Sequence, residues 1–375
     1  MSSNIPNLKI ALVHDWLLEV GGAEKVLKTL SEIFPSAPIF TLFYDKKFTD
    51  SFLPHTEIRP TFLQKLYEMF GGQKLLTPLM PLAIESIDLS DFDLVISSSV
   101  AFSKGLILKP QTTHICYCYS PMRQIWDWHA EYKQESCKVP SFITSIFQHF
   151  LRIWDRHAST RVDHFIAISK NVGQRILKYY GQPSEIIYPP VDLIKNYSAQ
   201  NSTPKDYFLI VSRLFRHKNI DIAVEAFNKL GLSLIIIGHG PDLKRLRKNA
   251  SSSVTFLGYQ PDEIVSNYYQ NCIAFIMPQE EDFGITPLEA MSCGKPVLAL
   301  KRGGALEYIR EGINGEFFEY PTEEVLADGV RRLKENLSKY NVQEIKKTAE
   351  RFSKERFKKE IIELVKSKIN HYDNA

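Results

Sequence analysis

The stretch Glu280–Val297 carries the residues best suited to chemistry. It follows an apolar run, Ala274–Pro278, that we predict to be a buried strand, and it holds two carboxylates eight residues apart, Glu281 and Glu289. A glycine-containing turn that opens a helix presents free backbone N–H groups, which bind anions such as phosphate. A carboxylate in the first helical turn can accept hydrogen bonds from a ribose diol. Both glutamates are therefore candidates for contacting a nucleotide or a sugar.

The same residues also fit a purely structural interpretation. Thr286 suits the N-cap of a helix, Pro287 suits its first position, and Glu289 would complete a capping box. In that case Glu289 would stabilise the helix through its dipole by about 1 kcal/mol or less. The spacing alone leaves both interpretations open.

Basic residues follow another predicted strand, Phe208–Ser212. Directly after this strand come Arg213, Arg216 and Lys218. In parallel sheets, ligands bind at this carboxyl end of the strands. An arginine offers a planar fork to phosphate and a lysine offers a point charge, so these side chains favour a phosphate site. The alternative is a solvated basic turn.

Pairs of glycines follow three further predicted strands. Such glycines allow a ligand to approach the backbone closely, although each pair also fits an ordinary turn. The pairs are Gly21 with Gly22, Gly238 with Gly240, and Gly303 with Gly304. The middle pair lacks a third glycine and is therefore weak as a dinucleotide fingerprint.

Several other chemistries are disfavoured. The ten histidines show no metal-ligand spacing, so we predict no protein-held metal. Gly294-Lys295 is followed by proline, which excludes a Walker loop. Asp91 and Asp93 immediately precede a predicted strand and fit turn chemistry. The five cysteines form no C-x-x-C pair, which fits a reduced compartment.

The elements that position these residues form two series of strands and helices. A length of 375 residues suggests two domains, and short β-branched runs alternate with amphipathic segments. The pattern restarts after Tyr188–Pro190. We therefore expect two doubly wound α/β domains, each with ligands at the carboxyl ends of its strands and a cleft between them. The segment from Glu344 to about Asn370 is predicted to be an amphipathic helix that could cap either domain.

The charge balance and the hydropathy exclude further classes of function. The net charge is only +3, from 46 basic and 43 acidic residues, so nothing indicates a nucleic-acid partner. The first residues do not resemble a signal peptide, and no apolar run approaches the ~20 residues that span a bilayer. We expect a cytoplasmic protein.

One basic, aromatic-rich region suggests contact with a membrane surface. Residues Lys138–Lys178 contain seven Lys or Arg but only two acids, and Ser141–Trp154 mixes aromatic and aliphatic residues. Thr61–Phe70 is similar in character. A basic amphipathic helix can lie in an anionic interface, or its apolar side can simply pack on the sheet. Both remain open here.

Taken together, these stretches resemble the retaining family-4 glycosyltransferases of GT-B fold. GGAEKV, the Arg213/Lys218 pair, GHG, FLGY, the two glutamates and the GG loop occur in the family's order. VHDWLLEVGGAEKV, ISSSVAFSKGL and CYCYSPMRQIWD resemble most the branch of O-antigen-type mannosyltransferases that use GDP-mannose. With this fold we expect an N-terminal domain, residues 1–188 joined by a C-terminal helix of about 356–375, and a nucleotide-sugar domain, residues 189–355.

The resemblance also implies a role for each matching residue. Arg213 and Lys218 would bind the donor diphosphate and act in catalysis with Glu281, and Glu289 would bind the ribose. The remaining donor-side residues would be Phe283, Gly284, Ile285, Thr286, Gly238, Gly240, Tyr259, Gly21 and Gly22. The candidates on the acceptor side are Asp15, Arg123 and His114. Val100 stands where many relatives carry a histidine that contacts the donor sugar.

The resemblance implies a nucleotide-sugar donor, with no further cofactor and no metal. The expected acceptor is a lipid-linked or polysaccharide glycan, reached at the inner face of the cell membrane. Two alternatives bind the same donor. One is a GT-B nucleotide-sugar epimerase, and the other is a non-catalytic nucleotide-sugar-binding partner of another transferase.

Overall fold

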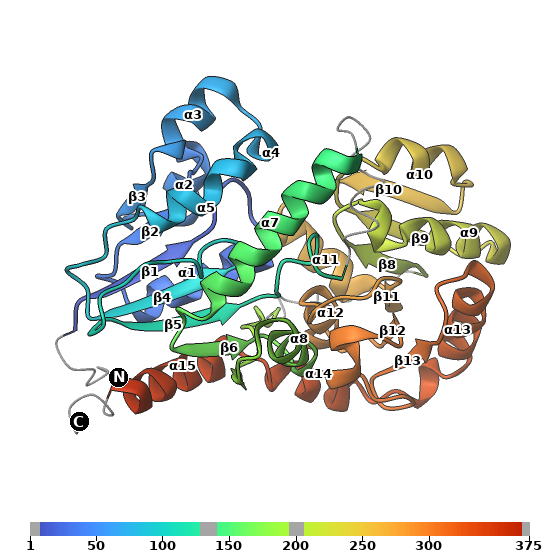
Figure 1. Cartoon of the computed structure of the whole chain (residues 1–375). Helices are drawn as coiled ribbons and strands as arrows, with labels where there is room; N and C mark the ends of the chain where they lie inside the picture. The colour runs from blue at the N-terminus through green and yellow to red at the C-terminus, as the bar shows by residue number, and fades with distance from the viewer. Residues whose placement is uncertain (1–7, 128–140, 195–205, 370–375) are drawn as a thin grey trace. The chain divides into compact units, whose positions relative to one another are not determined.

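The computed structural model describes residues 8–127, 141–194 and 206–369 (Figure 1). The chain divides into two compact units. The first comprises residues 1–190 and 357–375, and the second comprises residues 191–356. Each unit is built on its own parallel sheet.

The first unit contains a seven-stranded sheet in the order β3-β2-β1-β4-β5-β6-β7, and every neighbouring pair is parallel. Its strands are β1 (Ile10–His14), β2 (Ile39–Thr41), β3 (Ile58–Pro60), β4 (Leu94–Ser99), β5 (Thr113–Cys118), β6 (His164–Ala167) and β7 (Ser184–Ile186). Its helices are α1 (Gly22–Ile33), α2 (Lys46–Phe52), α3 (Leu63–Phe70), α4 (Gln73–Leu76), η1 (Thr77–Leu79), α5 (Met80–Glu85), α7 (Ser141–Ser159) and α8 (Lys170–Tyr180).

The second unit contains a six-stranded parallel sheet in the order β10-β9-β8-β11-β12-β13. Its strands are β8 (Phe208–Val211), β9 (Leu234–Ile237), β10 (Val254–Gly258), β11 (Ala274–Met277), β12 (Val297–Leu300) and β13 (Gly315–Phe318). Its helical segments are η2 (Arg216–Lys218), α9 (Ile220–Leu230), α10 (Leu243–Asn249), α11 (Asp262–Asn271), α12 (Thr286–Ser292), η3 (Gly303–Glu307), α13 (Glu323–Glu335), η4 (Leu337–Lys339) and α14 (Val342–Glu350).

Each sheet reverses its strand order at one point. In the first unit β1 lies between β2 and β4, and in the second unit β8 lies between β9 and β11. The loops that leave β1 and β4, or β8 and β11, therefore begin side by side at the carboxyl edge. In open α/β sheets this is where ligands bind.

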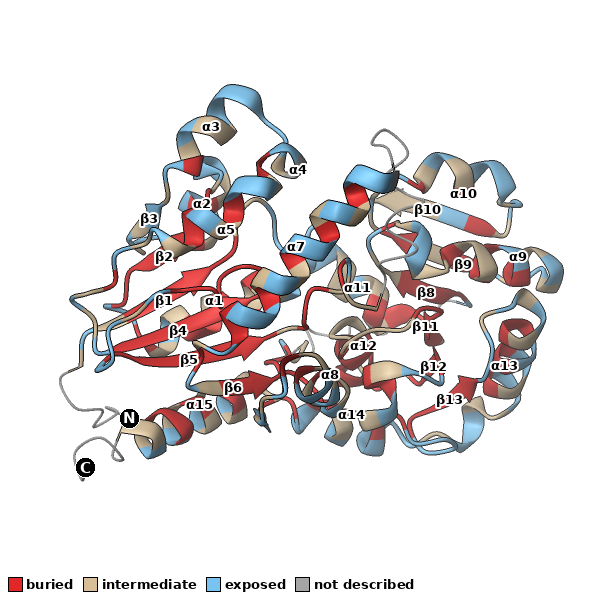
Figure 2. Ribbon diagram, viewed as in Figure 1, coloured by how far each residue is buried: buried red, intermediate tan, exposed pale blue. Residues whose placement is uncertain are grey.

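The predicted α/β class is confirmed, and its cause lies in the apolar runs. Strands of parallel sheets are covered on both faces, so they appear in the sequence as continuous apolar segments rather than as alternating ones. All six residues of β4 and of β5 are buried, as are the four residues of β11 and of β12. Figure 2 shows the strands of both sheets as largely buried.

The predicted C-terminal helix is in fact two helices. After α14 the chain leaves helical geometry, and it resumes in α15 (Lys354–Ile369). The break occurs because the carbonyl of Phe352 accepts a hydrogen bond from the N–H of Val191, and Ser353 pairs with Val191 as an isolated bridge. The Phe352 ring is also buried against the rings of Phe283 and Tyr308.

Helix α15 carries the chain back into the first unit. The ring of Phe357 contacts that of Tyr117 in β5 with centroids 5.6 Å apart. Lys358 pairs with Glu32 of α1 at 2.8 Å. Phe357, Ile361 and Val365 are buried, so the last helix supplies part of the packing of the first unit.

A buried ion pair ties the loop after β4 to α7 and α8. Lys104 Nζ lies 2.5 Å from Asp155 Oδ1, and both side chains are almost completely buried. The other carboxylate oxygen accepts hydrogen bonds from Trp126 Nε1 at 2.8 Å and from the Tyr180 hydroxyl at 2.9 Å. Burial alone would lower the pKa of Lys104, but the attraction of Asp155 outweighs it and raises that pKa.

This arrangement predicts that Lys104→Met destabilises the protein by about 3–5 kcal/mol, because it leaves the Asp155 carboxylate buried without its cation. Denaturant unfolding monitored by circular dichroism measures the loss. The double variant Lys104→Met/Asp155→Leu should lose less than the sum of the two single variants. Strictly additive losses would show that the two groups do not interact.

Candidate functional site

Two residues far apart in the sequence meet at the carboxyl edge of the second sheet. Lys218 lies in η2 after β8, Glu281 lies in the loop after β11, and Lys218 Nζ donates to Glu281 Oε1 at 2.6 Å. Gln279 Nε2 donates to the same oxygen at 2.9 Å. The pair forms because β8 and β11 are neighbours in the sheet.

The charge state of this pair is set by its surroundings. Burial by itself would raise the pKa of Glu281, but Lys218 and the Gln279 amide hold that pKa below its usual value. Glu281 is therefore a carboxylate at neutral pH that accepts hydrogen bonds only. An ammonium has three donors, so Lys218 can keep Glu281 and still donate to an anion.

Two glycine-rich loops are stacked backbone to backbone beside this pair. The N–H of Gly304 donates to the carbonyl of Glu281 at 2.9 Å. A Cβ added at Gly304 would collide with the backbone of Phe283, and Gly303 has a φ of +62°. Gly284 also has a positive φ, +90°. The predicted sugar-contacting turn is thus held in place by the Gly303–Gly304 loop.

The structure corrects the predicted capping box. Helix α12 starts at Thr286 itself, Ile285 occupies the N-cap position, and no side chain caps the helix. Ile285 already has helical dihedral angles, so Thr286 lies one position too far along to act as the cap. The Glu289 carboxylate accepts a hydrogen bond from the Tyr269 hydroxyl of α11 at 3.0 Å, and burial raises the pKa of Tyr269 well above its usual value.

The remaining donor-side candidates of the second unit lie at the carboxyl ends of β8, β9 and β10, whereas Gly21 and Gly22 lie in the first unit at the start of α1. Gly238 has a φ of +137°, and a Cβ there would collide with the carbonyl of Ser212, while Gly240 packs in the same way on Leu214. The loops after β8 and β9 are therefore in direct backbone contact. The Arg213 side chain is exposed after β8. Tyr259, after β10, exposes 70% of its surface.

In the first unit, Asp15 anchors the loop that follows β4. Its two carboxylate oxygens accept hydrogen bonds from four consecutive backbone N–H groups at 2.5–2.9 Å, those of Val100, Ala101, Phe102 and Ser103. Asp15 is completely buried. The structure thus gives this acceptor-side candidate an anchoring role, with both oxygens occupied by the backbone. Val100 takes part through its N–H alone.

Beside Asp15, the structure shows a residue that the sequence analysis missed. Glu24, in the first turn of α1, points back over Gly21, where a Cβ would come within 2.6 Å of its carboxylate. Glu24 Oε1 lies 3.6 Å from Nε2 of the buried His14. His14 Nδ1 lies 3.0 Å from the hydroxyl of Ser98. The sequence signal for Glu24 is an acidic residue two positions after the glycine pair Gly21-Gly22.

The other two acceptor-side candidates lie at opposite ends of β5. Arg123 follows the strand, with its Nε 3.4 Å from Asp127, which also pairs with Arg175. His114 is instead the second residue of β5, buried at the amino end, where its Nε2 lies 2.8 Å from the Ser97 hydroxyl. The structure therefore does not bring His114 to the carboxyl edge with the other candidates.

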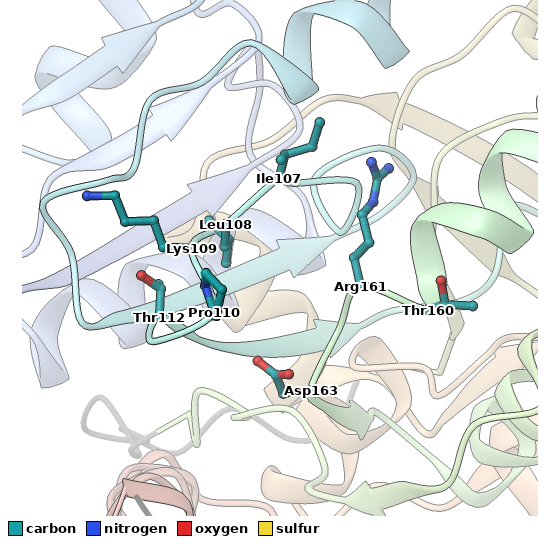
Figure 3. Close-up of a pocket in the computed structure, with 8 residues that line it drawn as sticks. All are labelled: Ile107, Leu108, Lys109, Pro110, Thr112, Thr160, Arg161 and Asp163. Atoms are coloured by element: carbon teal, nitrogen blue, oxygen red, sulfur yellow. The ribbon is translucent and has the colours of Figure 1, made fainter.

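A separate cavity of about 300 Å³ lies near the amino ends of β5 and β6 (Figure 3). Its lining includes Lys109, Thr112, Arg161 and Asp163. Because the candidate residues gather at the carboxyl edges, this cavity is not part of the candidate site. Among residues 8–127, 141–194 and 206–369, no group of three or more His, Cys, Asp or Glu side chains is arranged to hold a metal ion.

Two family models match adjacent parts of the chain. Residues 20–195 match Glycosyltransferase Family 4, and residues 194–367 match Glycosyl transferases group 1. The chain belongs to glycosyltransferase family 4. The two matches overlap at residues 194 and 195 and together cover all the candidate residues except Asp15.

Individual relatives support the same family. An uncharacterised glycosyltransferase of Methanocaldococcus jannaschii, MJ1178, is 27% identical over 213 residues, 56% of this chain and 58% of that protein. The alpha-1,3/1,6-mannosyltransferase ALG2 of Saccharomyces cerevisiae is 27% identical over 40% of each chain. The chain thus spans about half the length of these curated relatives.

A solved structure shows the same fold over nearly the whole chain. Anabaena HepE, crystallised with UDP, has a TM-score of 0.72 and 19% identity, covering 96% of this chain and 100% of that one. This similarity confirms the predicted GT-B class with two Rossmann-like domains.

The buried position of His114 leads to a prediction for this glycosyltransferase. Burial lowers the pKa of His114 to about 3, whereas an unfolded histidine titrates near 6.5. The unfolded chain therefore binds the extra proton first, and stability is lost as the pH falls below about 6.5. Between pH 7 and pH 5 the expected loss is about 2 kcal/mol.

Denaturant unfolding of the wild type and of His114→Gln, at both pH values, measures this loss. The variant should show a pH dependence that is smaller by about that amount. An identical pH dependence in both proteins would mean that His114 is not held neutral in the fold.

Proposed function

We propose that the protein is a retaining glycosyltransferase that transfers mannose from GDP-mannose to a lipid-linked or polysaccharide glycan. The observation that carries the proposal is the Lys218–Glu281 pair at the point where the second sheet reverses its strand order. In this proposal the pair places a cation that binds phosphate next to a carboxylate that binds the sugar.

The chemistry follows from the charges that develop during transfer. Cleavage of the sugar–phosphate bond builds negative charge on the diphosphate and positive character on the sugar. In this proposal Lys218 and Arg213 stabilise the diphosphate through charge-assisted hydrogen bonds of about 1.5–3 kcal/mol each. Glu281 and the backbone of the Phe283–Thr286 turn hold the sugar hydroxyls, and Glu289 accepts from the ribose. A diphosphate is a good leaving group and needs no strong general acid.

The choice of donor rests on the resemblance of the N-terminal motifs and on ALG2, a relative named for mannosyl transfer. The structure of HepE with UDP makes a uridine donor the main competitor. For the acceptor side we propose the carboxyl edge of the first sheet, where Gly21, Glu24 and Arg123 lie. We further propose that the enzyme works in the cytoplasm at the inner face of the membrane.

The donor is tested with a panel of nucleotide sugars in metal-free buffer. GDP-mannose should raise the melting temperature by several degrees and release GDP slowly by hydrolysis, whereas UDP-glucose, UDP-N-acetylglucosamine and GDP-fucose should stabilise less. A preference for a uridine donor would overturn the proposed donor but keep the reaction. A change of the sugar without release of nucleotide would indicate an epimerase, and binding without turnover would indicate a non-catalytic partner.

The role of Glu281 is tested by Glu281→Gln, which keeps the shape of the side chain but removes the charge. Turnover should fall by about 10²–10³-fold, with the melting temperature changed little. The matched control is Glu319→Gln, which breaks another lysine–glutamate pair of 2.6 Å, Lys301–Glu319 on the surface. It should keep turnover within about twofold of the wild type. Equal rates in both variants would remove Glu281 from the reaction.

A further inference from the structure

Helix α7 has one buried side and one exposed apolar side. Leu151 is buried in the core of the first unit, and Phe147 and Trp154 pack against that core. The exposed side carries large apolar residues at helical spacing: Phe142, Ile143, Ile146, Phe150 and Ile153. Phe142 and Phe150 expose 73% and 65% of their surface. One side of α7 therefore packs on the core of the first unit, and its other side is exposed.

A second row of exposed apolar residues lies on helical segments that share a core cluster with α7. Leu75, Leu79 and Leu82 lie on α4, η1 and α5 at intervals of four and three residues, and all three are exposed. Helices α5 and α7 pack on the same core cluster and are tied by Trp154 Nε1, which donates to Glu85 Oε1 at 2.9 Å. Figure 2 shows exposed surface along both segments. We call these two rows of residues the apolar face.

The exposed charges at the end of α7 are basic, and Glu85, the last residue of α5, is ion-paired with Arg161 at 2.7 Å. Residues 73–84 contain no acid, and the one acid of α7, Asp155, is buried against Lys104. The last turn of α7 carries Arg156 and His157, both exposed. An apolar strip that ends in basic residues, without exposed acids along it, is complementary to an anionic interface.

We propose that the apolar face docks on a lipid bilayer that contains anionic phospholipid, with α7 lying along the surface. Clusters of exposed large apolar residues on a protein surface often mark an interaction site, and the charge pattern here favours a membrane surface as the partner. In the part of the chain that the structure describes, no helix has both the length and the apolar character to span a bilayer.

This inference deepens the proposed function, since it assigns the surface that would bring the enzyme to a lipid-linked acceptor. Its test does not depend on transfer activity. Vesicle binding is measured by co-sedimentation of the full chain with phosphatidylcholine vesicles, with or without about 30% phosphatidylglycerol. We expect binding to the anionic vesicles, weakened when the salt is raised from about 0.05 M to about 0.5 M.

The double variant Leu82→Glu/Phe150→Glu should bind these vesicles at least about tenfold more weakly, because each change removes apolar area and adds a charge of the wrong sign. Leu177→Glu on α8 is the matched control, since Leu177 is 62% exposed in the same unit but outside the apolar face. It should bind as the wild type does. Circular dichroism and the melting temperature with donor are the checks that both variants are folded.

Three results would overturn the proposal. The first is an absence of binding to anionic vesicles at low salt, and the second is equal binding by the double variant. The third is wild-type self-association that the double variant abolishes without any vesicle binding, which would assign the face to a second copy of the chain. None of these results bears on donor binding, so a failure here is distinguishable from a failure of the proposed reaction.

Discussion

The order of strands in the two sheets is the constraint on which the candidate site depends. Parallel strands end at a common edge, and only where the order reverses do two loops diverge and leave room for a ligand. That position falls between β1 and β4 in one unit and between β8 and β11 in the other. Asp15 lies at the first reversal and the Lys218–Glu281 pair lies at the second.

Around both reversals, polar and steric contacts fix the backbone in addition to hydrophobic packing. Asp15 fixes the loop after β4 through four N–H groups. In the other unit, glycines let the loops after β11 and β12 touch backbone to backbone. A site held in this way needs little rearrangement when charge develops, which is the condition for strong electrostatic stabilisation.

Much of the fold could be predicted because buried parallel strands such as β4 and β11 are continuous apolar runs. The short edge strands β3 and β7 carry no such signal, because most of their residues are exposed. The residue types of the candidate site and their order along the chain could also be predicted from the sequence. The contact between Lys218 and Glu281 could not, because the two residues are 63 positions apart and only the pairing of β8 with β11 brings them together. The anchoring role of Asp15 was hidden for the same reason, because its partners are backbone groups more than 80 residues away.

The return of α15 to the first unit affects the order in which the two units can fold during synthesis. Phe357, Ile361 and Val365 are buried in that unit, although they are synthesised after the whole of the second unit. During translation the second unit can therefore complete its core first, while the unit that begins the chain waits for its final helix. A ribosome that stalls before residue 357 leaves the Tyr117 ring of β5 without its contact to Phe357.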